Sequence, residues 1–479
     1  MPDKEDQNLS NEQKRKKMLA HISQRVHASS PLPKNNSERK LQTKLDKLMH
    51  RLQDETVSET NLVDLLTEYA LTLQEQAEQQ KEEENGDVVE GLHAKACVAY
   101  EFASKWKERY TIYYNWAIAV GDRARVLESK RPEEARVLWR EACEKYEKAV
   151  EVGMERSYLR GKEGFSGEMV TSMSVSRALN NHGLALRQRA MLMTDSETEE
   201  STESKSKCLS EAILKFRRAI RISPDFHRAA YNLGTVEFAR GQMERAAVYV
   251  FSALAMVTSA LPSSSETENA KVVYSQSAQL VETALPDTQC GDDSLFAGNV
   301  WFAGGVGGKR EDAKNKRRTT ITDFDWARRR FAVCASAFKT VDSAQTFRIK
   351  SESGDYVPSR NDAWGDDAAT DTHFNVNLPM LSVESCEPIS DISRPPNCFA
   401  FLLSIRDDLK DSEKENDDKD SPPAVVRHYR FACETESERD VWVDAIALLA
   451  SLAKRGKSEH LKSCLLSLKT KRKKRVGFV

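Results

Sequence analysis

The sequence has no run of about 18 apolar residues, the length that a membrane-spanning helix requires. Its first residues, MPDKEDQNLSNEQKRKK, lack the apolar core of a signal peptide. Its nine cysteines stand singly, with no C-x-x-C pair, which is typical of an intracellular chain with reduced thiols. We therefore expect a cytoplasmic protein whose contact with an endomembrane or the plasma membrane is peripheral.

Catalytic and metal-binding motifs are also missing. The nine histidines show no metal-ligand spacing and no H-E-x-x-H, and no G-x-S-x-G turn is present. The stretch AGGVGGKR imitates a phosphate-binding loop, but Ala303 replaces the first glycine and Arg310 replaces the Ser or Thr that would hold magnesium. The sequence therefore predicts a non-enzymatic protein with no metal and no cofactor.

Charge is unevenly distributed along the 479 residues, although the net charge is only -2. An acidic, serine-rich run occupies 196–204 and a basic run occupies 469–475, so partners must be inferred from local patches. Residues 1–40 carry too little apolar surface to offset the entropy of ordering, and we expect a disordered tail there. The remainder is long enough for two or three domains.

Residues 41–284 follow a helical pattern in which one phrase recurs. Its clearest form spans 229–254, where a helix with the small residue Gly234 is followed by a turn at Gly241 and a second helix with Ala246. Small residues at such positions let two antiparallel helices approach closely. A triad of alanine, aromatic and alanine recurs in three earlier second helices, at 96/100/103, 142/146/149 and 212/216/219.

This pattern resembles the tetratricopeptide repeat (TPR). The resemblance implies a solenoid whose concave surface binds a peptide or helix of a partner protein. The alternative is an ordinary all-helical bundle with small residues in its seams. We expect the helix at 266–284 to cap the stack, and the acidic insert at 194–207 to be a solvated loop or a phosphorylation site.

Four residues are candidates for the partner-peptide surface. An asparagine recurs at one register, just before the close-packed position, and its amide could hold a peptide backbone by paired hydrogen bonds. TPR domains that clamp a carboxylate add basic residues nearby, and one arginine is suitably placed. The candidates are Asn115, Asn181, Asn232 and Arg228.

After about residue 293 the sequence changes to short β-prone segments punctuated by glycine. They are followed by an amphipathic helix, TESERDVWVDAIALLASLAK, in which Thr435 and Glu438 are spaced as a capping box and Trp442 lies on the apolar face. Such a helix can plug one open end of a barrel. The segments are LFAGNVWFA, RRFAVCASAF, QTFRIKS, FNVNLPML, CFAFLLSI and HYRFACE.

The stretch HYRFACETESERDVWVDAI resembles the last strand and C-terminal helix of the pleckstrin-homology (PH) family, with Trp442 as its hallmark tryptophan. WARRRFAV resembles the second strand of that family, and the resemblance covers about 293–455. Composition predicts a disordered loop at 406–423. The expected fold is multidomain, with an all-α TPR-like solenoid followed by a PH-like β-barrel capped by a C-terminal α-helix.

PH domains that bind phosphoinositides do so between their first two strands, with basic residues in the connecting loop. Strand alternation places Arg329 on the face of Phe331, toward the mouth of the barrel, and the two neighbouring arginines on the opposite, solvated face. Two other basic positions of the family motif hold Phe302 and Ala327, so lipid binding and a protein-only role both stay open. The lipid headgroup candidates are Lys309, Arg310, Lys314, Lys316, Arg317, Arg318 and Arg329.

Residues 456–479 form a basic tail in which Leu461, Cys464, Leu465 and Leu468 share one helical face. We expect an amphipathic helix that lies on an acidic membrane surface. The basic run could instead be a nuclear import signal or a solvated tail. It has no interleaved aromatics, so nucleic-acid binding is not favoured.

The two resemblances and the basic tail together imply a non-enzymatic adaptor. Its TPR-like domain would bind a partner protein, and its PH-like domain and tail would associate with anionic, phosphoinositide-containing membranes. Such an adaptor would serve membrane trafficking or cytoskeleton organisation. The alternative is a soluble scaffold in which the PH-like domain binds protein and not lipid.

Overall fold

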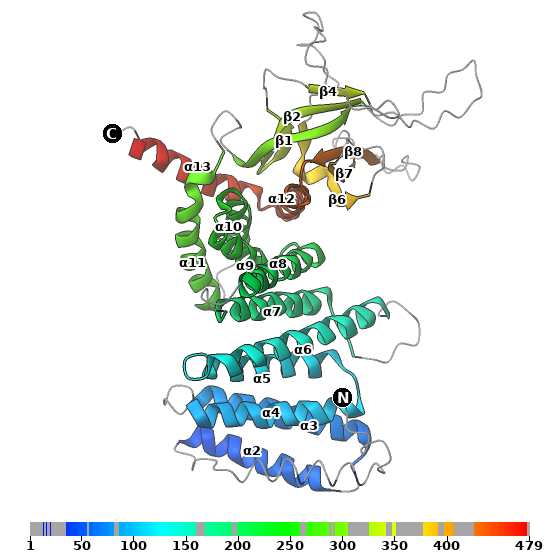
Figure 1. The fold of residues 1–479 in the computed structure, drawn as a ribbon, viewed down its shortest axis with the longest axis vertical. Helices are drawn as coiled ribbons and strands as arrows, with labels where there is room; N and C mark the ends of the chain where they lie inside the picture. Colours follow the sequence, from blue (N-terminus) through cyan, green and yellow to red (C-terminus); the bar gives the residue numbers. More distant parts are fainter. Residues whose placement is uncertain are drawn as a thin grey trace, which may run out of the picture. The chain divides into compact units, whose positions relative to one another are not determined.

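The computed structural model describes residues 35–54, 57–80, 86–159, 168–193, 199–258, 265–286, 293–304, 325–341, 347–350, 377–390, 397–406 and 426–476, together with positions 13, 16, 20 and 290. By their contacts these residues form two compact units, Met1–Ile222 and Ser223–Val479. Figure 1 shows helices in the first unit, and helices followed by strands and two further helices in the second.

The first unit is helical, and successive helices pack as neighbours along the chain (Figure 1). The closest pairs are α3 with α4, α5 with α6 and α7 with α8, which is the hairpin arrangement expected from the repeated phrase. The helices are α2 (Asn36–Gln53), α3 (Glu59–Gln80), α4 (Gly86–Trp106), α5 (Tyr110–Leu127), α6 (Pro132–Leu159), α7 (Ser172–Met191) and α8 (Glu199–Ile222).

Small residues line the seams of these hairpins. A Cβ atom added to Gly183 of α7 would lie 2.7 Å from the ring of Phe216 of α8, so only glycine fits there without movement. Phe216 and the two alanines of its triad, Ala212 and Ala219, are fully buried. The structure confirms the close approach of helices that the recurring small residues predict. The corresponding triads at 96/100/103 and 142/146/149 are buried as well.

Two boundaries in the first unit differ from the prediction. Helix α2 begins within the predicted tail of 1–40, because the side chain of Asn35 caps it by accepting a hydrogen bond from the backbone N–H of Glu38 (2.9 Å). Helix α8 begins at Glu199, so the second half of the acidic insert is helical, and that half contains no glycine or proline to stop a helix. Residues 194–198, and most of 1–34, lie outside the described residues.

The second unit opens with a further hairpin. Gly241, with a φ of +74°, makes the turn, and a Cβ atom on Gly234 would lie 2.7 Å from Val250 Cγ2 across the seam. A third helix packs on this hairpin as the predicted cap, with the ring of Tyr274 stacked on that of Tyr231 at 4.1 Å between centroids. These elements are α9 (His227–Ala239), α10 (Met243–Thr258), α11 (Ser265–Val281) and the 3-10 turn η3 (Glu282–Ala284).

Helix α10 is buried on every side, with all residues of 246–257 buried. It contacts not only α9 and α11 but also β1 (Ser294–Gly304), α12 (Glu436–Lys454) and α13 (Ser458–Val476). The prediction placed all the repeat helices in one domain, 41–284, and began a separate β domain at 293. In the structure the last hairpin, α9 with α10, belongs to the same unit as the sheet. The physical reason is that a helix that is apolar all round must be covered on all faces.

The strands form one antiparallel sheet in the order β5-β3-β2-β1-β8-β7-β6, with β4 paired to β2. Within the described residues no pairing joins β5 to β6, so the sheet is open and the predicted closed barrel is not formed. Helix α12 packs against β6 and the 3-10 turn η7 (Met380–Ser382) instead. The strands are β1, β2 (Asp325–Cys334), β3 (Ala337–Thr340), β4 (Phe347–Lys350), β5 (Asn377–Pro379), β6 (Val383–Ile389), β7 (Phe399–Arg406) and β8 (Val426–Cys433).

Strand β6 is the one described strand that the sequence did not predict. Its sequence, VESCEPI, is polar and includes Pro388, which is typical of a strand at a sheet edge. It pairs with β7 at the end of the sheet. The predicted loop at 406–423 begins at the last residue of β7, and its remaining positions lie outside the described residues.

Aromatic side chains fill the inner face of the sheet. Phe331 of β2 and Phe431 of β8 are fully buried, with ring centroids 5.4 Å apart. Trp442 of α12 is buried beneath β1, where a Cβ atom on Gly298 would lie 3.3 Å from its Cζ2. The Thr435 side chain accepts a hydrogen bond from the Glu438 backbone N–H at 3.1 Å. The predicted core tryptophan and the Thr435 cap of α12 are both confirmed.

Helix α13 differs from the predicted amphipathic tail. Leu461 and Leu465 have no exposed surface, and α13 contacts α10 and α12. The apolar face that was expected to lie on a membrane is therefore used in the protein's own fold. The boundary predicted between the β domain and the tail at 455/456 falls inside the second unit.

Candidate functional site

Arg329 lies where strand alternation predicted it, on the face of β2 that carries Phe331. Its partner across the β1–β2 pair is Val300, which is buried, and Phe331 is opposite Gly298 on the same face. The Arg329 side chain is half-buried and lies nearer to the β1–β2 loop than Phe331 does. The inner face of the sheet thus presents the guanidinium of Arg329 beside the predicted mouth.

Arg328 and Arg330 lie on the opposite face of β2 and are half-exposed. Arg328 pairs with Glu434 at 2.6 Å, and its guanidinium lies 6.0 Å from the centroid of the Trp301 ring. An ion pair of this exposure contributes little to stability, about 0–1 kcal/mol. These contacts match the predicted solvated face of the strand.

The other six headgroup candidates belong to the loop between β1 and β2. Residues 305–324 lie outside the described residues, so the geometry of this group of cations stays a prediction. The predicted residues that fall there are Lys309, Arg310, Lys314, Lys316, Arg317 and Arg318.

The four partner-peptide candidates divide between the two units. Asn115 on α5 and Asn181 on α7 belong to the first unit and are half-buried. The amide of Asn181 donates a hydrogen bond to the Tyr114 hydroxyl at 3.2 Å, so this asparagine also holds α7 against its neighbours. Asn232, half-buried, and Arg228, exposed, lie on α9 in the second unit.

An aromatic cluster surrounds Asn181 that sequence reasoning missed. The Tyr114 ring stacks on that of Tyr110 at 5.5 Å and meets Tyr146 of α6 edge-on at 6.1 Å. Tyr146 in turn stacks on His182 at 6.4 Å. Burial raises the pKa of the Tyr110 and Tyr146 hydroxyls above their ordinary value. The sequence did contain one signal of this cluster: Tyr110 and Tyr114 are four residues apart and so lie on the same face of α5.

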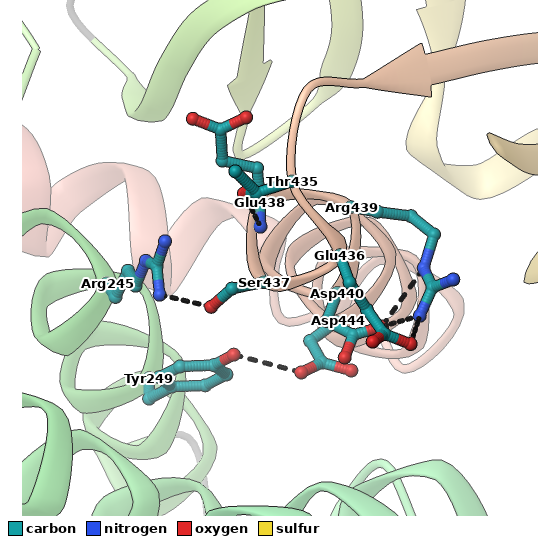
Figure 2. A network of polar contacts seen from close by, with 9 residues as sticks. All are labelled: Arg245, Tyr249, Thr435, Glu436, Ser437, Glu438, Arg439, Asp440 and Asp444. Atoms are coloured by element: carbon teal, nitrogen blue, oxygen red, sulfur yellow. Dashed lines mark hydrogen bonds and ion pairs between the residues drawn. The ribbon is translucent and has the colours of Figure 1, made fainter. Parts of the chain in front are cut away.

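A polar network joins α10 to α12 within the second unit (Figure 2). The Tyr249 hydroxyl donates a buried hydrogen bond to Asp444 Oδ2 at 2.9 Å. One turn earlier on α10, Arg245 donates to the Ser437 hydroxyl in the first turn of α12. In that first turn of α12, the Arg439 guanidinium forms ion pairs with two carboxylates of the same helix. Sequence reasoning missed this network, although the uninterrupted apolar run of α10 indicated that another element must cover it.

Two buried cysteine thiols are poorly suited to nucleophilic chemistry. All nine cysteines are free. Burial raises the pKa of Cys143 and of Cys334 to about 12, so both thiols stay protonated and are poor nucleophiles at neutral pH. No group of three or more metal-ligating side chains occurs within the described part of the chain.

None of the described helices has the combination of length and apolarity that a bilayer-spanning helix needs. No protein-family model matches the chain, and neither does any curated protein sequence.

Proposed function

We propose that the protein is a non-enzymatic adaptor, in which a TPR-like helical array binds a partner protein and a PH-like domain associates with anionic membrane. The helical part of this proposal is supported by the recurring hairpins, whose paired helices approach most closely at Gly183 and Gly234. Arrays of this kind present extended surfaces to peptides or helices.

The PH-like limb is supported by the antiparallel strand order, by the helix that follows the last strand, and by buried Trp442 under β1. The observation that carries the membrane proposal is the placement of Arg329 on the inner face of β2, beside the loop that holds six further basic residues. Several converging cations are what a phosphorylated headgroup requires.

Two adjacent arginines provide the test. Full-length protein would be sedimented with phosphatidylcholine vesicles that contain, or lack, a phosphoinositide. Arg329→Gln should lower binding to the phosphoinositide vesicles, whereas Arg330→Gln removes the same charge from the opposite face and should have a smaller effect. Equal losses would mean that only net charge matters. Wild-type protein that sediments with no vesicle would favour the soluble scaffold in which this domain binds protein.

The helical surface needs a separate test. Proteins captured by the intact chain would be compared with those captured by Asn181→Ala combined with Asn232→Ala. Asn61→Ala, at an exposed position of α3, is the matched control. A partner that is lost from the double variant and kept by the control would support binding at these asparagines. An unchanged set of partners would place the binding surface elsewhere.

A further inference from the structure

The basic C-terminal helix is fixed to the second unit by residues spaced four apart. Leu461 and Leu465 have no exposed surface, and Lys469 is 7% exposed. The Lys469 ammonium donates hydrogen bonds to the backbone carbonyl and the hydroxyl of Ser294, each at 3.1 Å. Ser294, the first residue of β1, is itself fully buried. The stripe 461/465/469 therefore attaches α13 to the body of the unit.

These anchors are strong enough to hold the helix in place. Burying a leucine side chain removes its apolar surface from water and so stabilises the packed position of the helix. A buried ammonium needs hydrogen-bond acceptors, and Lys469 has two of them here. Just before the helix, Lys457 adds a hydrogen bond to the Met256 carbonyl of α10 at 3.4 Å.

An amphipathic helix that binds a membrane must place its apolar side among the lipid chains. In α13 two of the three leucines of the predicted membrane face are buried in the protein, and Leu466, at 36% exposed, is the most exposed described leucine of the helix. Beyond Lys469 the helix continues through Val476, which adds about two turns. In sequence these turns hold Lys471, Arg472, Lys473, Lys474 and Arg475.

We propose that residues 471–475, carried on the anchored helix α13, form a contact surface for an anionic lipid bilayer that acts through charge alone, without insertion. This proposal rests on the membrane association in the proposed function, and it names the site and the mode of that contact. The basic run has no interleaved aromatic residues on which nucleic-acid bases could stack, which favours lipid over single-stranded nucleic acid.

The expected effect is large and depends on salt. Each cation close to an acidic membrane surface contributes about fivefold to binding, so five of them contribute about three orders of magnitude at low salt. Raising the salt shortens the screening length from about 30 Å at 0.01 M to about 8 Å at 0.15 M, and binding should fall steeply.

Full-length protein would be sedimented with phosphatidylserine-containing vesicles and with neutral vesicles at low and physiological salt. Replacing all five cations of 471–475 by glutamine should lower the partition coefficient by about three orders of magnitude at low salt. A matched variant loses five exposed cations from α2 instead and should bind as the wild type does. Its substitutions are Arg39→Gln, Lys40→Gln, Lys44→Gln, Lys47→Gln and Arg51→Gln.

A third variant, Leu466→Gln, should bind vesicles as tightly as the wild type, because charge and not insertion makes the contact. A loss of binding in this variant, or binding insensitive to salt, would overturn the charge-only mode. If wild-type protein binds the vesicles and the five-glutamine variant binds equally well, this site is wrong while the membrane function stands. If wild-type protein binds no vesicle, the membrane limb of the proposed function fails and the inference fails with it. Tail-dependent binding to duplex DNA without vesicle binding would assign the surface to nucleic acid.

Discussion

Lowering the pH is expected to destabilise the first unit through His182 on α7. This side chain is 4% exposed, stacks on the Tyr146 ring, and has no hydrogen-bond partner for its Nδ1 among the described residues. Burial, with a smaller contribution from the positive charge of Lys215, lowers the pKa of the imidazole from 6.5 to about 3. The folded protein therefore holds this histidine neutral.

The sign of the effect follows from the two protonation states. Because the folded-state pKa lies below the unfolded-state pKa, the unfolded chain binds a proton more readily between pH 6.5 and about pH 3. The stability is fully present above pH 6.5 and falls as the pH decreases through that window, by about 1.4 kcal/mol per pH unit. At about pH 5 the loss due to His182 amounts to about 2 kcal/mol.

Urea unfolding followed by far-UV circular dichroism, at about pH 7.5 and about pH 5, measures this loss. Other groups also titrate, so the wild type is compared with His182→Leu; leucine suits the site because Leu233 occupies the corresponding buried position before Gly234. The change in unfolding free energy between the two pH values should be about 2 kcal/mol smaller in the variant. His50→Gln, at an exposed position of α2, should keep the wild-type pH dependence. Equal pH dependence in the wild type and His182→Leu would refute the burial argument.

Four further substitutions test packing, hydrogen bonding and capping, and urea unfolding measures all of them. Gly183→Ala should lower the unfolding free energy by about 1–3 kcal/mol because its Cβ would meet a ring of α8 at 2.7 Å. Gly91→Ala on α4, with no atom within 4 Å of the new Cβ, should raise it by up to about 1 kcal/mol. Tyr249→Phe should cost the second unit about 1–3 kcal/mol, because Asp444 loses a buried donor. Thr435→Ala should cost about 1 kcal/mol by removing the side-chain cap of α12.

Matched variants make each of these outcomes decisive. If the two glycine substitutions change stability alike, the close approach of α7 and α8 does not constrain the sequence. Tyr231→Phe removes a half-buried hydroxyl that bonds to Ser277, and it should cost less than Tyr249→Phe. Thr435→Ser keeps a hydroxyl at the cap and should retain most of the stability; a cost equal to that of alanine would contradict the capping argument.

Features with a short sequence period could be predicted from the sequence. Strand alternation was enough to separate Arg329 from Arg330, since successive side chains of a strand point to opposite faces. A three-residue spacing was enough to place the cap of α12, because the Thr435 side chain and the Glu438 backbone N–H meet within one helical turn. The recurring glycine and alanine positions predicted which helices pair, because close packing leaves the same volume requirement in each hairpin.

Features that join distant parts of the chain were decided by the tertiary structure. The Tyr249 and Asp444 side chains are 195 residues apart, and neither carries a local signal of the other. The same holds for Lys469 and Ser294, which are 175 residues apart. The sequence determined that α13 has an apolar stripe, because helical periodicity is local. It did not determine what covers Leu461 and Leu465, because the hydrophobic effect is non-directional and favours burial against lipid and protein alike. In the folded chain α13 packs against α10 and α12, and that packing removes the stripe from the surface.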